Sequence, residues 1–323
     1  MGGLGVYLLR RTLFAIPVFL AVSIITFLAM NAVGNPADIV RIGLKNPTAA
    51  QLAAICSYFH CHDPVFQRYF YWLIDFLQGN LGRSLYSGTV AGSVGPWILT
   101  TLELQIPGLL LSLMIGIPIG IFSAKRQYSK ADLAVTTSAI FGVSTPTFWL
   151  GIVAIIVFSG QLHWLPSSGA VSGFPPYIGG SIYVDYIAHA ALPLFVLTFV
   201  SLAGIVRLVR ASMLDTLRQD FILAARASGV SEFKVVYKHA LKNAISPIVT
   251  VVGLGFGTLL AGAPALETTF SWPGLGYEFV TAVGKYDLPV VQGLTMIIAI
   301  MVLIANIATD LAYAFLDPRV RLS

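Results

Sequence analysis

The residues of this chain that could do chemistry are few, and none of them falls in a catalytic pattern. Gly284 and Lys285 are adjacent, as in a phosphate-binding loop, but the upstream glycine of that loop and the Ser or Thr after its lysine are missing. The sequence contains neither the His-Glu-x-x-His pattern of zinc hydrolases nor the Gly-x-Ser-x-Gly pattern of serine hydrolases. We therefore expect no catalytic residue, no metal site and no cofactor bound by this chain.

The two cysteines, Cys56 and Cys61, stand close together, and His60 and His62 flank the second of them. No standard zinc spacing is met, so a metal site is the weaker interpretation. Two cysteines five positions apart on a straight helix are too distant to bond, and a bridge between them therefore requires a turn. The pattern favours a disulfide or two thiols over a metal site.

Ionisable residues inside the apolar stretches, which ion-coupled transporters and pumps need, are nearly absent. Glu103 and Asp310 stand at the ends of such stretches, where a helix cap explains them better than a proton relay does. An ATP-independent channel or a secondary transporter is therefore only a remote alternative for the function of this chain. Any transport by this chain needs an energy source supplied by another protein.

The composition indicates the elements that must position these residues. The chain is 57% hydrophobic and only 10% charged, with a mean hydropathy of +0.83, whereas soluble domains carry about 25% charged residues. A helix needs about 20 apolar residues to cross a bilayer. Six stretches meet this requirement, so we expect an all-α, polytopic membrane protein whose spans are residues 12–37, 104–124, 133–162, 190–206, 243–266 and 288–309.

The placement of the basic residues orients these spans, because cytoplasmic loops carry an excess of Lys and Arg. With a cytoplasmic N-terminus, most of the 19 basic residues fall inside, and the exceptions are Arg41, Lys45, Arg68, Arg83 and Lys285. All but the last lie in the first outer loop, which is too long for the rule to apply. We therefore predict two cytoplasmic termini in the cell membrane, and we attribute the isoelectric point of about 9.2 to topology rather than to nucleic-acid binding.

This topology divides the chain into four parts. Residues 1–37 form the cytoplasmic N-terminal end and the first span, and residues 38–98 form a large extracytoplasmic loop domain. Residues 99–316 form the membrane core, which includes a cytoplasmic loop at 207–247, and residues 317–323 form a cytoplasmic tail. Within the outer loop, the aromatic-rich segment 64–77 predicts an amphipathic helix that lies at the membrane interface.

The cytoplasmic loop 207–247 has the most distinctive pattern in the chain. Small residues at 224, 225, 227 and 228 predict a helix that another protein can approach closely. Gly229 supplies a helix stop, because glycine enters the left-handed region without a Cβ penalty. Ser231 and Glu232 then indicate the start of a second helix. We interpret this helix–glycine–helix elbow as a surface held by another protein.

Several motifs resemble the membrane subunit, or permease, of ATP-binding-cassette importers of the type I fold. In that family the loop before the penultimate span carries Glu-Ala-Ala, three residues and then Gly; here Leu223 replaces the Glu, a departure common in the peptide branch. Further matches to that branch are Asn80-Leu81-Gly82-Arg83-Ser84, Thr101-Leu102-Glu103-Leu104, 239–244 with Pro247, Asp317-Pro318-Arg319-Val320-Arg321 and, as the most specific, Glu267-Thr268-Thr269-Phe270-Ser271-Trp272-Pro273-Gly274-Leu275-Gly276.

The resemblance implies the partners and the site residues. It implies a second homologous permease, two ATPase subunits that bind ATP and Mg, and an extracytoplasmic solute-binding protein. The ATPase-coupling residues would be Phe221, Leu223, Ala224, Ala225, Arg226, Ser228 and Gly229. An extracytoplasmic turn near the substrate entry would contain Glu267, Phe270, Trp272, Pro273, Gly274 and Gly276. The expected substrates are oligopeptides, with oligosaccharides or nickel as the alternatives.

Overall fold

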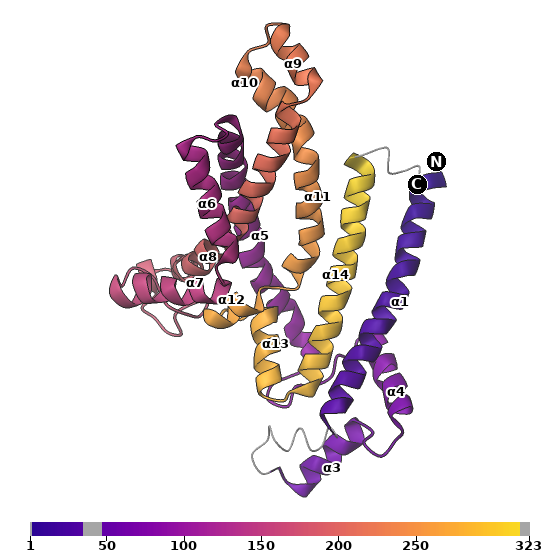
Figure 1. The fold of residues 1–323 in the computed structure, drawn as a ribbon. Helices are drawn as coiled ribbons and strands as arrows, with labels where there is room; N and C mark the ends of the chain where they lie inside the picture. The colour runs from indigo at the N-terminus through magenta and orange to yellow at the C-terminus, as the bar shows by residue number, and fades with distance from the viewer. Residues whose placement is uncertain (1, 35–46, 317–323) are drawn as a thin grey trace. The chain divides into compact units, whose positions relative to one another are not determined.

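A computed structural model describes residues 2–34 and 47–316 of the chain. These residues form helices and turns, together with one isolated antiparallel bridge between Arg83 and Thr89, which confirms the predicted all-α fold (Figure 1). Arg41 and Lys45 of the outer loop, and the predicted cytoplasmic tail 317–323 with its motif, lie outside the described residues.

The described residues form the following helices along the chain. In order they are α1 (Gly2–Val33), α3 (Ala49–Tyr58), α4 (Val65–Leu77), α5 (Val90–Lys125), α6 (Lys130–Ser144), α7 (Thr147–Ala154), the π-helix η1 (Ile155–Gln161), the 3-10 helix η2 (Ile178–Gly180), α8 (Ile182–Leu217), α9 (Asp220–Ala227), α10 (Glu232–Lys234), the π-helix η3 (Val235–Ala240), α11 (Leu241–Leu260), α12 (Pro264–Thr269), α13 (Leu275–Gly284) and α14 (Leu288–Leu316).

Packing groups these helices into two compact units, which we describe separately. Unit 1 comprises Met1–Thr101, Phe256–Pro264 and Pro273–Ser323, and unit 2 comprises Leu102–Gly255 and Ala265–Trp272. The four parts predicted from topology are defined by the side of the membrane on which each segment lies and not by packing, so that division stays a prediction.

Each of the six predicted spans contains helix, although residues 35–37 of the first span lie outside the described residues. Among the described residues, α1, α5, α8 and α14 each contain a helix long and apolar enough to cross a membrane, and a bent pair, 130–144 with 147–161, makes a fifth span if it is counted as one. The predicted span 243–266 corresponds to α11, which ends earlier, at Leu260. A turn follows there, with Gly262 in the left-handed region at a φ of 83°.

The predicted third span is not one straight helix, because α6 and the helix that follows it are bent by 101°. Thr145, at the break, has an extended ψ of 123°, and Pro146 follows it. Proline lacks an N–H and disfavours helical backbone at the residue before it, which explains the break. The span predicted for 133–162 is therefore a bent pair of helices rather than one continuous helix.

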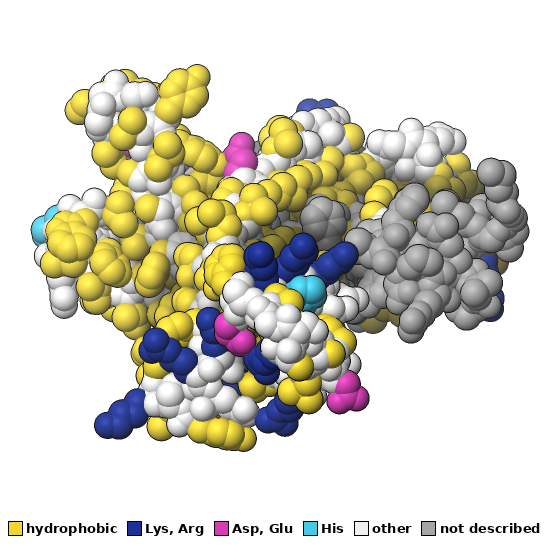
Figure 2. Space-filling model, turned by 90° about the horizontal axis from the view of Figure 1, so that it is seen from above, with side chains coloured by type: hydrophobic (Ala, Val, Ile, Leu, Met, Phe, Trp, Pro, Cys, Tyr) yellow, Lys and Arg dark blue, Asp and Glu magenta, His cyan; other side chains and the backbone are white. Residues whose placement is uncertain are grey.

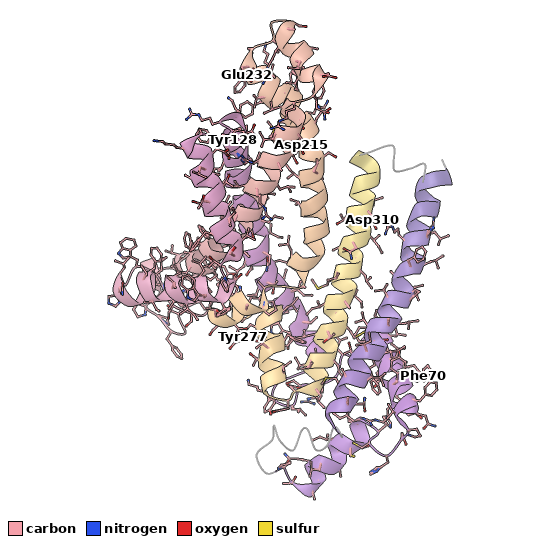
Figure 3. The ribbon with its side chains drawn as sticks, in the orientation of Figure 1. Phe70, Tyr128, Asp215, Glu232, Tyr277 and Asp310 are labelled. Atoms are coloured by element: carbon pink, nitrogen blue, oxygen red, sulfur yellow. The ribbon has the colours of Figure 1, made fainter. Side chains whose placement is uncertain are left out.

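In unit 1, α1 and α14 pack side by side along their length (Figure 1). Arg11 on α1 pairs with Asp310 on α14, with 3.1 Å between Nε and Oδ2, and Figure 3 shows Asp310 on the side of α14 that faces α1. The predicted amphipathic helix is present as α4, and it contacts α1 through a 2.8 Å hydrogen bond between the hydroxyls of Tyr69 and Ser23. Its outer face leaves Phe66 exposed, as the amphipathic prediction requires.

In unit 2, α5 and α8 approach each other closely. A Cβ added at Gly116 would lie 2.7 Å from the side chain of Ile205, and one added at Gly120 would lie 2.6 Å from that of Val209. Small residues let membrane helices pack this tightly. Figure 1 shows α9 and α10 at one end of this unit, beyond the end of α8. The tight α5–α8 pair is therefore the base on which the elbow rests.

Candidate functional site

The elbow predicted from the sequence is present between α9 and α10. The chain leaves α9 through Gly229, whose φ of 76° lies in the left-handed region, and the amide of Val230 donates to the carbonyl of Ala225 at 3.2 Å. A Cβ at Gly229 would meet nothing within 4 Å. Backbone conformation rather than space is therefore what requires glycine here, which confirms the predicted helix stop.

One face of α9 is anchored in the core of unit 2. Ile222 is completely buried, and Ala225 and Val230 pack against the same cluster. The cluster joins four neighbouring elements to α9, with these fully or nearly fully buried members: Ile121 and Ala124 of α5, Val209 and Met213 of α8, Val235, Val236 and Ala240 of η3, and Ala244 and Ile248 of α11. Burying one aliphatic side chain contributes roughly 1.5–3 kcal/mol, so the shared cluster fixes α9 to the ends of α5, α8 and α11.

The opposite face of α9 is open. Leu223 is 56% exposed, Phe221 is 41% exposed, and the small residues Ala224, Ala227 and Ser228 are exposed beside them. Only Ala225, of the small residues named from the sequence, turns inward. The result is a shallow apolar surface on a helix that cannot move independently of the core.

The second half of the elbow adds an ion pair and an aromatic pair. Arg226 donates to Glu232 across the glycine turn, from Nη2 to Oε1 at 2.9 Å and from Nε to Oε2 at 3.1 Å. These hydrogen bonds hold the pKa of the Glu232 carboxyl below its usual range, and partial burial opposes the shift. Phe233 and Tyr237, both exposed, stack with 4.7 Å between their ring centroids.

Helix α10 begins after Ser231, as predicted, but the Ser231 side chain does not form a cap hydrogen bond. The start is fixed instead by the backbone, since the amide of Val235 donates to the carbonyl of Ser231 at 3.0 Å. Figure 3 shows Glu232 at the tip of the elbow and Asp215 near the end of α8.

The surface around α9 is basic. Figure 2 shows Lys and Arg side chains gathered at this end of unit 2. The exposed members in this part of the chain are Arg207, Arg218, Arg226, Lys234, Lys238 and Lys242. An apolar helix face with a cationic surround suits a partner that offers an apolar groove with an acidic rim.

The predicted extracytoplasmic turn falls in both units, and its residues are not one exposed group. In unit 2, Glu267, Phe270 and Trp272 are 1%, 1% and 0% exposed. The Trp272 ring lies 5.3 Å from that of Tyr186 between ring centroids, and the Phe270 carbonyl accepts from the amide of Gly169 at 2.8 Å. In this conformation these three residues hold the turn in place rather than present their side chains to a solute.

The unit 1 part of the same turn begins helix α13. Pro273 is partly buried, Gly274 and Gly276 are buried, and the amide of Leu275 donates to Thr101 Oγ1 at 2.8 Å. A Cβ at Gly276 would lie 2.7 Å from Cα of Pro264, a backbone atom, so a side chain at this position would force the two segments apart. The glycine of the motif is thus required by close packing.

The two cysteines lie at the end of α3 and in the turn after it. The amide of Cys61 donates to the carbonyl of Cys56 at 3.0 Å, so the turn that a bridge needs is present. The sulfur atoms are not bonded to each other in this structure, and the disulfide stays a prediction.

One pair of residues was missed by the sequence interpretation. Asp132 of α6 binds Arg210 of α8 at the end of unit 2 that carries the elbow, with 2.6 Å between Nε and Oδ1. Arg210 was counted only as a basic residue of the loop. The signal that could have singled out Asp132 is its position, since it follows Lys130 at the start of an apolar stretch that otherwise has no acidic residue.

Comparisons with known proteins agree with this arrangement. Residues 116–322 match a family model described as a binding-protein-dependent transport system inner membrane component. The chain is 37% identical to the oligopeptide transport system permease protein AppB of Bacillus subtilis, over 98% of this chain and 99% of that protein. It is 39% identical to a putative peptide permease protein of Brucella ovis, over 98% and 99% of the two chains, and 35% identical to the dipeptide transport system permease protein DppB of Escherichia coli, over 98% of each.

Proposed function

The chain belongs to the family of binding-protein-dependent transport system inner membrane components, and on that premise we propose that it forms, with a second homologous permease, the path by which oligopeptides cross the cell membrane. It is a multi-pass permease subunit of an ATP-binding-cassette peptide transport system, and it acts in transport rather than as an enzyme. A solute-binding protein delivers the peptide to the outer side, and two ATPase subunits dock on the inner side.

The exposed face of α9 is the observation that carries this proposal. Leu223 and Phe221 are exposed on a helix whose other side is locked into the core by Ile222. Such a surface fits an apolar groove on an ATPase, in the manner of a helix in a groove. Because α9 is anchored, a movement of the bound ATPase displaces α8 and α5 with it rather than bending a loose loop.

The chemistry of ATP belongs to the partners. The ATPases bind ATP and Mg, and the permease residues at the elbow bind the ATPase without touching the nucleotide. Phe221, Leu223, Ala224, Arg226, Ser228 and Gly229 form or shape the contact, and Ala225 supports it from the buried side.

The orientation follows from charge. The loop 207–247 and both termini lie in the cytoplasm, because most Lys and Arg residues then fall on that side. The turn that contains Glu267, Trp272 and Gly276 then lies on the outer side, where the solute-binding protein releases the peptide.

The substrate class rests on the relatives, two of which carry oligopeptide and dipeptide in their names. Import of oligosaccharides or nickel by the same machinery is the alternative. Uptake competition in whole cells separates these alternatives, because unlabelled peptide would fail to compete with the transported solute if that solute were an oligosaccharide or nickel.

The direct test of the function is affinity purification of the chain from its native membrane, followed by mass spectrometry. We expect a second permease and two ATPases to accompany it, and ATP hydrolysis by the purified complex to rise when the loaded solute-binding protein is added. A chain that purifies alone and transports in proteoliposomes without ATP would replace this proposal with a secondary transporter.

A further inference from the structure

A buried ion pair joins three helices at the end of unit 2 that carries the elbow. Arg210 donates to the Asp132 carboxylate from Nε at 2.6 Å and from Nη2 at 2.7 Å. The same carboxylate accepts from the Ser123 hydroxyl and, at 2.9 Å, from the amide of Tyr128. The Asp132 side chain is 4% exposed and that of Arg210 is 22% exposed, so water replaces few of these contacts.

These contacts come from elements that are distant in sequence. Ser123 lies on α5, Asp132 on α6, and Arg210 on α8, while Tyr128 belongs to the turn between α5 and α6. These hydrogen bonds add a polar connection between the α5–turn–α6 hairpin and α8. The fork of the arginine fixes orientation as well as distance, because both of its hydrogen bonds require the same plane.

A buried ion pair is weak evidence for stability, since desolvation of two charges offsets most of their attraction. The effect of this ion pair lies instead in the relative orientation that it imposes on the helices. Arg210 lies one residue from Val209 and three from Met213, which belong to the cluster that anchors Ile222 of α9. The ion pair therefore ties α6 to the part of α8 that moves with α9.

The course of α6 supports a role in movement. This helix packs along α8 and ends at the 101° bend near Pro146. Beyond the bend, a Cβ at Gly151 of α7 would lie 3.0 Å from Thr269 and 3.2 Å from Phe270, so α7 is packed against the buried turn. The two halves of the bent span thus contact different ends of unit 2, and only α6 is tied to α8 by the ion pair.

We propose that Asp132 and Arg210 are positioning residues that carry the displacement of α9 into α6 during transport. The inference rests on the function proposed above, because it needs a partner that moves α9. Without the pair, α9, α8 and α5 still move together through the hydrophobic cluster, and α6 keeps only its apolar packing along α8. ATP hydrolysis then becomes uncoupled from transport although the complex is assembled.

The test uses the complete complex with its ATPases, second permease and solute-binding protein, reconstituted in liposomes. Peptide imported per ATP hydrolysed is measured for Asp132→Asn and Arg210→Lys, where the lysine keeps the charge but loses the fork. We expect this ratio to fall about tenfold, within the usual range of coupling energies between sites. The ATPase subunits recovered with the permease should stay within about twofold of the unmodified complex.

A matched control is Asp310→Asn, which removes an ion pair between two helices of unit 1, Arg11 with Asp310. It should leave the ratio of transport to hydrolysis unchanged. A double variant, Asp132→Asn with Arg210→Lys, should be no worse than either single change, because partners that act as one unit are not additive.

The outcomes separate this inference from the proposed function. If no ATPase accompanies the unmodified chain, the proposed function fails. If the unmodified complex is coupled and both Asp132→Asn and Arg210→Lys keep its ratio of transport to hydrolysis, the positioning role is overturned. If Asp132→Asn does not fold, the result with Arg210→Lys alone tests the positioning role, because this variant keeps the charge balanced.

Discussion

Arg226 and Glu232 face each other across the Gly229 turn, and two hydrogen bonds of 2.9 and 3.1 Å close the elbow between α9 and α10. The ion pair is partly exposed, with 39% and 54% of the two side chains accessible. Exposed pairs contribute about 0–1 kcal/mol, so the pair sets the shape of the elbow more than it stabilises the protein.

The first prediction concerns acid. Because the pKa of Glu232 is lowered in the folded chain, the pair stabilises the elbow above the ordinary glutamate pKa of 4.5 and loses this effect as the pH falls through the lowered value. Above the ordinary glutamate pKa, the amides around Val230 should exchange more slowly than in Glu232→Gln measured at the same pH. As the pH falls through the lowered pKa, this difference between the two proteins should disappear. Equal exchange in both proteins at every pH would contradict the ion pair's role.

The second prediction concerns Gly229, whose φ of 76° is unfavourable for side chains. Replacing it with Ala should destabilise the elbow by about 1–2 kcal/mol, the cost of left-handed backbone, and should weaken co-purification of the ATPase. Asn tolerates this conformation better, so Gly229→Asn is the matched control and should retain more ATPase than Gly229→Ala. Equal recovery with both variants would mean that backbone strain at the elbow does not affect docking.

The third prediction separates the two faces of α9. Ile222→Ala removes a fully buried side chain and should lower the free energy of unfolding by about 2–5 kcal/mol. Leu223→Ala removes a side chain that is 56% exposed, so its thermal midpoint should stay near that of the unmodified chain while ATPase recovery falls. Thermal unfolding in detergent and pull-down of the ATPase measure the two effects. A drop in midpoint for Leu223→Ala would place this side chain in the core instead.

The fourth prediction concerns the contact between α5 and α8. A Cβ at Gly120 would lie 2.6 Å from Val209 Cβ and 3.0 Å from the backbone oxygen of Val206, so Gly120→Ala should cost about 1–3 kcal/mol through overpacking. Gly204 on α8 has nothing within 4 Å of an added Cβ. Gly204→Ala is thus the control, and it should match or slightly exceed the thermal midpoint of the unmodified chain. A neutral Gly120→Ala would mean that the two helices can separate at little cost.

Local patterns in the sequence predicted much of the site. The small residues near Ala224, the stop at Gly229 and the helix start at Ser231 depend on neighbouring residues and on backbone preference, and the structure confirms them. Ser231 occupies the N-cap position of that second helix, and its backbone carbonyl accepts the first hydrogen bond of the helix.

Local sequence patterns did not predict which residues of the outer turn are buried. Trp272 resembles an exposed aromatic beside turn residues when only its neighbours are considered, yet it is completely buried against Leu104 and Ala190. These contacts come from segments far away along the chain. Likewise, the 101° bend near Pro146 is followed by contacts of α7 with Thr269 and Phe270, which are far away along the chain.

Hydrophobic content and the spacing of charges were sufficient to predict an all-helical membrane chain, because lipid solvation and helix length act on consecutive residues. The family resemblance came from short motifs. Tertiary packing decided which face of α9 is open, which turn residues are buried and which carboxylate binds Arg210. Asp132 stands 78 residues away from that arginine, and only the folding of α6 onto α8 brings a charge of each sign within hydrogen-bond distance.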